Sequence, residues 1–124
     1  MQQQARTETR PELALRQALR VLGVRGYRLH RRALPGVRRT IDIAFVAKKV
    51  AVFVNGCFWH GCADHRTVPR AHRHWWQEKL AANKRRDGET DRLLREAGWV
   101  VVRVWEHDDP ETVAREVAAM VASR

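Results

Sequence analysis

The chain has 124 residues, of which 44% are hydrophobic and 31% charged, a composition that supports one compact domain with a buried core. Its 24 Lys and Arg outnumber 14 Asp and Glu and give a formal charge of +10. Nucleic acids are the polyanions that such a charge favours, although an inert basic surface is the plainer alternative. No apolar run is long enough to span a membrane, and the first residues do not form a signal peptide, so we expect a cytoplasmic protein without a membrane partner.

The N-terminal part of the chain predicts a flexible arm followed by a helix. Residues 1–8 are polar and charged, which is typical of a basic arm, and residues 9–124 are expected to form the single domain. The segment Thr9-Arg10-Pro11-Glu12 has the pattern of a capping box with proline in the first helical turn. The helix that begins there should end near Leu22, because Gly23 follows.

The next segments predict strands. Residues 27–31 alternate weakly in hydrophobicity and precede the turn Leu34-Pro35-Gly36, which favours an edge strand. Residues 40–46 and 50–54 are apolar and rich in β-branched side chains, and the three residues between them form a tight connection. Because residues 50–54 are apolar on both faces, we expect helices to cover both sides of the sheet.

The C-terminal half predicts two helices separated by a strand. Residues 75–97 are expected to form a long or broken helix, with Gly88 as the candidate point of interruption, and residues 99–105 a third buried strand. A last helix should begin at Asp109-Pro110-Glu111. The order of the elements therefore predicts an α/β fold with a mixed central sheet flanked by helices.

Asp42 is a chemical outlier within its predicted strand. A carboxylate between Ile41 and Ile43 is costly to bury unless a cation or hydrogen bonds compensate it. One hypothesis is a Mg²⁺ ligand, because hard cations prefer carboxylate oxygens. The alternative is an aspartate on the solvent side of an edge strand, or one paired with Arg38 or Arg39.

The segment from Asn55 to His74 loses all periodicity and is rich in Cys, His, Gly and aromatic residues. Cys57, Cys62 and His65 supply three nitrogen or sulfur ligands within one loop, and His107 is a candidate fourth ligand of a structural zinc ion. His72 and His74 compete for that fourth position. The alternative is a pair of packed free cysteines among surface histidines.

Aromatic residues gather around the same loop. Phe58 and Trp59 lie between the candidate ligands, and Trp75 and Trp76 begin the following helix. In a basic protein such residues can wedge between base pairs or stack on bases, whereas ordinary core packing is the alternative. Within that helix Asn83 and Asp87 are four residues apart and share a face, where a carboxylate could orient a histidine or a hydrated metal.

Several of these motifs together resemble the very-short-patch repair (Vsr) endonuclease family. The matching segments are Thr9-Arg10-Pro11-Glu12, Ile41-Asp42-Ile43-Ala44-Phe45, Gly56-Cys57-Phe58-Trp59-His60, Asn83-x3-Asp87 and Gly98-Trp99-x5-Trp105-Glu106. The resemblance implies a restriction-endonuclease-like α/β core with a zinc-stabilised loop. It also implies a Mg²⁺-dependent nick on the 5′ side of the thymine in a T:G mismatch, which arises when 5-methylcytosine deaminates.

The resemblance assigns roles to five residues of the expected catalytic centre. Asp42 corresponds to the metal-binding aspartate, and the main-chain carbonyl of Val54 completes the protein contacts of Mg²⁺. His60 corresponds to the histidine that helps to position or deprotonate water, and Asp87 to the residue that orients it. Glu12 matches a glutamate near the site and could also cap its helix.

The resemblance also covers the loop, with departures. Cys57 corresponds to a zinc ligand, and His107 stands where the family often has a cysteine. The residues Phe58, Trp59 and Trp76 match the aromatic wedge that enters the duplex. Asn55 takes the place of a second active-site histidine, and the spacing of Cys57, Cys62 and His65 differs from the histidine–cysteine pair of the best-known members.

The leading hypothesis is therefore a monomeric DNA repair endonuclease that acts on double-stranded DNA containing a T:G mismatch, with other mismatch-repair proteins as candidate partners. Mg²⁺ would be its catalytic ion and Zn²⁺ its structural ion. The first alternative is a zinc-stabilised DNA-binding module without hydrolytic activity, for which Asn55 is the most suggestive feature. The second is a related nuclease that cuts paired DNA.

Overall fold

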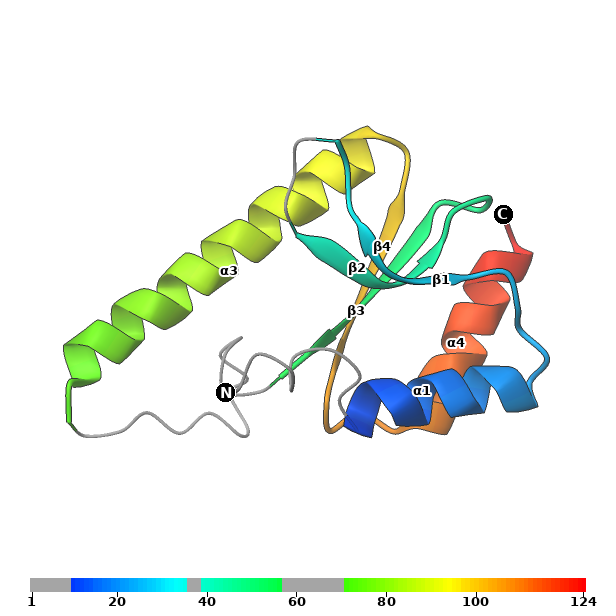
Figure 1. Cartoon of the computed structure of the whole chain (residues 1–124), viewed down its shortest axis with the longest axis horizontal. Helices are drawn as coiled ribbons and strands as arrows, with labels where there is room; N and C mark the ends of the chain where they lie inside the picture. The colour runs from blue at the N-terminus through cyan, green and yellow to red at the C-terminus, as the bar shows by residue number, and fades with distance from the viewer. Residues whose placement is uncertain (1–9, 36–38, 57–70) are drawn as a thin grey trace.

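The computed structural model describes residues 10–35, 39–56 and 71–124 (Figure 1). In chain order its elements are α1 (Arg10–Val21), β1 (Arg28–Arg32), β2 (Thr40–Phe45), β3 (Val50–Asn55), α3 (Arg73–Glu96), β4 (Val100–Trp105) and α4 (Pro110–Ala122). The predicted arm, residues 1–8, and the predicted zinc ligands of the loop lie outside the described residues. No helix within the described ranges combines the length and the apolar character that crossing a membrane requires.

The four strands form one mixed sheet in the order β1-β2-β3-β4. β2 pairs antiparallel with both β1 and β3, whereas β3 and β4 run parallel. The tight connection between β2 and β3 explains their antiparallel pairing, and α3 provides the long crossover that a parallel pair needs. The predicted α/β fold with a mixed sheet is confirmed.

Helices cover both faces of the sheet. α1 and α4 lie side by side against one face, and the C-terminal part of α3 lies against the other while its N-terminal part extends away from the sheet (Figure 1). The first core consists of Leu15, Leu19, Ile43, Phe45, Val50, Val52, Val104, Val113, Ala114 and Val117. The second, smaller core consists of Ala33, Ile41, Ala44, Ala51, Phe53 and Leu94. β3 contributes to both cores, as its two apolar faces predicted.

In the C-terminal half, the structure decides between two alternatives for the long helix and corrects the prediction for the strand that follows it. α3 runs without interruption from Arg73 to Glu96, because Gly88 is exposed and one glycine costs a long helix only about 1 kcal/mol. β4 is an edge strand in which Val104 alone is buried, and not the buried strand that its apolar sequence indicates. The last helix is confirmed, and Asp109 caps it by accepting a hydrogen bond of 3.0 Å from the Thr112 N–H.

Candidate active site

Three side chains that are distant in sequence converge between α1 and the sheet. Glu12 comes from the first turn of α1, His30 from β1 and Asp42 from β2. One ligand atom from each of them lies within 4.8 Å of the other two. A nitrogen and two carboxylate oxygens at this spacing form a cluster that can hold a metal ion.

Glu12 is the most deeply buried charged residue of this cluster. Its side chain is 2% exposed, and its position in the first turn of α1 is one that the helix dipole makes favourable for a carboxylate. Arg16, one turn along the same helix, places Nη1 3.8 Å from Glu12 Oε2. The expectation that Glu12 lies near the site is consistent with this position. Its capping partner Thr9 is outside the described residues.

Sequence reasoning missed His30. The register of β1 with β2 pairs Leu29 with Ile43 and Arg31 with Ile41, so His30 falls opposite Asp42. Its backbone has a φ of 51°, in the left-handed region, and its Nε2 lies 2.8 Å from Glu12 Oε2. That nitrogen is buried, yet it makes no well-aligned hydrogen bond with any described residue.

Asp42 accepts a hydrogen bond of 2.7 Å from the Val54 N–H through Oδ2. The pKa of Asp42 is raised to about 6, mainly by burial and in part by the negative charge of Glu12, although the Val54 hydrogen bond and the charges of His30 and Arg103 oppose the rise. Asp42 is not paired with Arg39, which contacts Thr90 and Glu89 instead. The site therefore disfavours two ionised carboxylates without a counter-charge. A bound cation would supply that counter-charge.

Asn55 and Asp87 meet a different partner, Arg103 of β4. Arg103 Nη1 donates a hydrogen bond of 3.1 Å to Asn55 Oδ1 and lies 3.8 Å from Asp87 Oδ2. The same guanidinium makes close contacts with Asp91 and stacks over the Phe53 ring at 4.2 Å from its centroid. This Arg103 cluster joins α3 to the sheet beside the three-residue cluster, and its charge acts on Asp42.

The other predicted site residues divide into two groups. The residues His60, Cys57, Cys62, His65, Phe58 and Trp59 all lie outside the described residues. The second group lies within the part of the chain that the structure describes. His107 follows β4 and stacks on Trp105 with ring centroids 6.4 Å apart. Trp76 is half-buried and meets Trp75 edge to face at 4.7 Å. Of the competing histidines, His72 precedes α3, and exposed His74 pairs with Glu78 at 3.1 Å.

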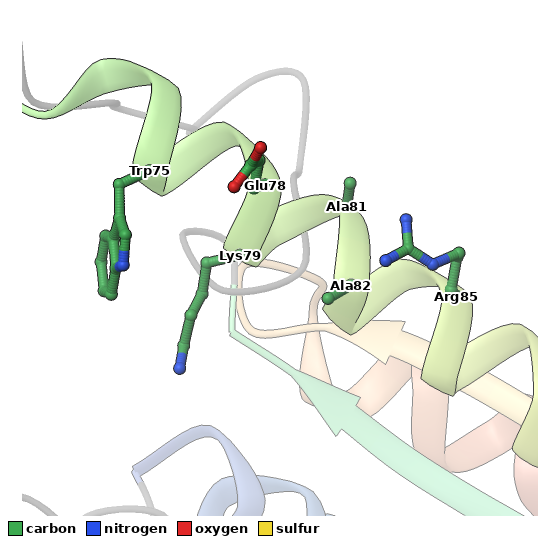
Figure 2. A pocket seen from close by; sticks show the side chains of 6 residues that line it. All are labelled: Trp75, Glu78, Lys79, Ala81, Ala82 and Arg85. Carbon is green, nitrogen blue, oxygen red and sulfur yellow. The ribbon is translucent and has the colours of Figure 1, made fainter.

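A shallow hollow lies beside the N-terminal half of α3 (Figure 2). It is lined by Trp75, Glu78, Lys79, Ala81, Ala82 and Arg85. Trp75 and Lys79 extend to the same side of the helix, and Lys79 Nζ lies 5.7 Å from the centroid of the Trp75 ring. An exposed aromatic ring beside a cation is suited to contact a nucleic-acid backbone and its bases.

Comparison with known proteins connects these residues with DNA cleavage. The family model described as DNA mismatch endonuclease Vsr matches residues 1–66, which include the whole three-residue cluster. Type II nicking enzyme V.NaeI of Lentzea aerocolonigenes is 46% identical over 123 residues, which are 98% of this chain and 72% of that protein.

Two further relatives extend the comparison. Type II nicking enzyme V.XorIIP of Xanthomonas oryzae pv. oryzae is 42% identical over 108 residues, covering 86% of this chain and 76% of that protein. DNA mismatch endonuclease Vsr of Escherichia coli is 34% identical over 82 residues, covering 64% of this chain and 50% of that protein. Two proteins similar to most of this chain are therefore named nicking enzymes, and a third is named a DNA mismatch endonuclease.

Proposed function

Because this chain belongs to the Vsr family of DNA endonucleases, we propose that it makes a Mg²⁺-dependent nick on the 5′ side of the thymine in a T:G mismatch. The observation that carries the proposal is the convergence of Glu12, His30 and Asp42. The mixed sheet, with one carboxylate on its interior strand β2 and another on the helix packed against it, supports a restriction-endonuclease-like core. Residues 9–124 would form the endonuclease domain, preceded by the basic arm 1–8.

The donor set of the cluster fits a divalent cation. Glu12 and Asp42 would hold Mg²⁺ through carboxylate oxygens. The raised pKa of Asp42 is consistent with a site whose negative charge a bound cation would compensate. The Val54 carbonyl is a further proposed ligand, because the Val54 N–H bond to Asp42 keeps this part of β3 at the site. When bound, Mg²⁺ would stabilise the charge that develops on the scissile phosphate and acidify a bound water.

His60 is the proposed group that accepts a proton from the attacking water, with Asp87 as the residue that orients its imidazole. The position of Asp87 supports a carboxylate that is held in place, because its Oδ2 lies 3.8 Å from Arg103 Nη1. Asn55 would contribute through the same cluster, since its amide is buried and bonded to Arg103.

DNA binding would use the basic surface and the aromatic residues. The formal charge of +10 supports salt-sensitive affinity for phosphates. Trp76, together with Phe58 and Trp59, would wedge into the duplex beside the mismatch, where unstacking a weakly paired step costs less. We expect the protein to act as a monomer on double-stranded DNA and to cooperate with other mismatch-repair proteins.

A structural Zn²⁺ would be held by Cys57, Cys62, His65 and His107. The parallel register supports the fourth ligand, because Asn55 pairs with Trp105 and both Cys57 and His107 follow these paired ends by two residues. Metal analysis by mass spectrometry tests this proposal. Cys57→Ser and His107→Asn should lose bound zinc, whereas His74→Asn, at an exposed position, should keep it.

A second candidate function is a nick in fully paired DNA. The names of V.NaeI and V.XorIIP describe type II nicking enzymes and mention no mismatch, which is the observation in its favour. The non-catalytic DNA-binding module is disfavoured by family membership, although Asn55 remains the feature that would support it.

The deciding experiment is a nicking assay with Mg²⁺ on end-labelled duplexes that differ only in T:G or T:A at one position, across several flanking sequences. The proposal expects a cut 5′ to the mismatched thymine, which EDTA, Asp42→Asn and His60→Ala each abolish. Arg92→Gln is the matched control, because Arg92 and its partner Glu96 are both 60% exposed. Equal cutting of both duplexes supports the second candidate, and binding without cutting supports the non-catalytic module.

A further inference from the structure

The cluster contains a histidine whose place in the reaction the sequence motifs do not assign. His30 Nε2 lies 2.8 Å from Glu12 Oε2, and one ligand atom each from His30, Glu12 and Asp42 lie within 4.8 Å of one another. The side chain is 22% exposed, but Nε2 itself is buried. A buried imidazole nitrogen between two carboxylates is positioned as a donor atom for a cation that both carboxylates share.

The backbone of His30 departs from ordinary strand geometry to reach this position. Its φ of 51° is uncommon for a residue other than glycine, while its neighbours Leu29 and Arg31 keep their pairs with β2. A left-handed residue costs about 1 kcal/mol or more, and such residues cluster at functional sites. The pairs on either side hold the conformation, which directs the imidazole toward Glu12.

Asn55 does not offer an alternative side chain to the cluster. Its amide oxygen accepts a hydrogen bond of 3.1 Å from Arg103, and its side chain is buried there. In the part of the chain that the structure describes, His30 is the imidazole that the fold brings to Glu12 and Asp42.

We propose that His30 Nε2 is a ligand of the active-site cation and that it makes the site bind Mn²⁺ more tightly than Mg²⁺. Imidazole is a better ligand for Mn²⁺ than for Mg²⁺, which prefers an all-oxygen shell. This inference rests on the proposed function for the role of the cation, but its test requires no DNA.

The test measures binding of the metal alone to the full chain. Mn²⁺ affinity is measured by electron paramagnetic resonance, Mg²⁺ affinity by competition, and directly bound nitrogen by its hyperfine coupling to Mn²⁺. The wild type should bind Mn²⁺ at least about tenfold more tightly than Mg²⁺ and show one coupled imidazole nitrogen. His30→Asn should lose the coupling and about tenfold or more of the Mn²⁺ affinity, with a much smaller change for Mg²⁺.

Three comparisons make the result specific. Asn tolerates a left-handed backbone, so His30→Asn should keep the fold, and a thermal melt within a few degrees of the wild type checks this. His74→Asn is the matched control, because exposed His74 pairs with Glu78 on α3, and it should bind both metals as the wild type does. His60→Asn should retain the nitrogen coupling. A wild type without coupling, or a coupling that persists in His30→Asn, overturns the inference.

Failure of this inference is distinguishable from failure of the proposed function. A protein that nicks T:G duplexes but shows no nitrogen coupling retains its function and overturns the role of His30. A protein whose coupling depends on His30 but which cuts no duplex confirms the ligand and overturns the proposed reaction. Asp42→Asn should weaken the binding of both cations, because it removes a ligand that they share.

Discussion

Arg103 of β4 and Asp91 of α3 form a two-pronged ion pair that joins the helix to the sheet. Arg103 Nε lies 2.9 and 3.0 Å from the two Asp91 carboxylate oxygens, and Nη2 lies 2.8 Å from Oδ1. The same guanidinium bonds to Asn55 and lies near Asp87. Since the N-terminal part of α3 extends away from the sheet (Figure 1), this pair helps to fix the orientation of the whole helix.

Removing this anchor should destabilise the protein and lower its nicking rate. Arg103→Met leaves the largely buried carboxylate of Asp91 without its cation, so we expect a loss of about 2 kcal/mol in the free energy of unfolding. Asp91→Asn in the Arg103→Met background should restore part of that loss, because it removes the unpaired charge. Urea denaturation of both single variants and of the double variant measures the coupling.

The matched control for this prediction is Arg92→Met, which breaks an exposed pair with Glu96 on the same helix. Such pairs contribute less than about 1 kcal/mol, so this variant should unfold close to the wild type. Equal effects of Arg92→Met and Arg103→Met would contradict the anchoring role of Arg103.

Replacing Asp42 should stabilise the metal-free protein at high pH. Its folded-state pKa of about 6 lies above the ordinary value of 3.8, mainly because of burial. The contribution of the Asp42 carboxyl to the free energy of unfolding is therefore fully present below about pH 4, and it is lost as the pH rises through about 6. Asp42→Asn should gain at most about 3 kcal/mol at pH 8 and almost nothing at pH 4, because the amide oxygen can still accept the Val54 N–H.

Thermal melts in EDTA at both pH values measure this effect. Glu89→Gln is the control, because Glu89 is 55% exposed and its neutralisation should change the melting temperature little at either pH. An Asp42→Asn protein that is less stable than the wild type at pH 8 would show that the carboxylate has a stronger partner than the Val54 N–H.

Local patterns in the sequence were sufficient to predict most of the fold. The capping pattern before Leu15, the apolar runs of β2 and β3 and the Asp109-Pro110 start of α4 each depend on residues close in sequence. The burial of β4 was wrongly predicted, because an edge strand and a central strand can have the same apolar sequence. Edge position depends on strand order, which no local pattern contains.

The site was predicted less completely than the fold. Asp42 stood out because a carboxylate is unusual in a buried strand, and Glu12 was found by the family resemblance. His30 carried no such signal, since an isolated histidine in a weakly alternating strand is unremarkable. Its role emerges only from the β1–β2 register and a left-handed φ, both set by long-range pairing. Arg103 was missed for the same reason, because its partners come from β3 and α3.

The uninterrupted course of α3 through Gly88 predicts a stabilising substitution. Gly88 is exposed, and a Cβ added there would meet no atom within 4 Å. Gly88→Ala should therefore raise the free energy of unfolding by about 0.5–1 kcal/mol, because alanine loses less backbone entropy in a helix. Gly98→Ala is the opposing control. Because Gly98 has a φ of 90°, this substitution should lower the free energy of unfolding. Urea midpoints that fall for Gly88→Ala would contradict a continuous helix.

The N-terminal half of α3 should contribute a sequence-independent part of DNA affinity. Lys79 is exposed beside Trp75, which is itself 52% exposed, and both extend to the same side of the helix (Figure 2). If Lys79 neutralises one phosphate, Lys79→Gln should weaken binding to T:G and T:A duplexes equally and lower the slope of log affinity against log salt by about one. Fluorescence anisotropy at several salt concentrations measures both quantities.

Arg115→Gln is the control for this prediction. It removes the same charge from α4, which lies against the other face of the sheet, and it should leave the slope unchanged. A slope that falls equally in both variants would mean that the net charge of the protein, rather than this face of α3, determines the effect.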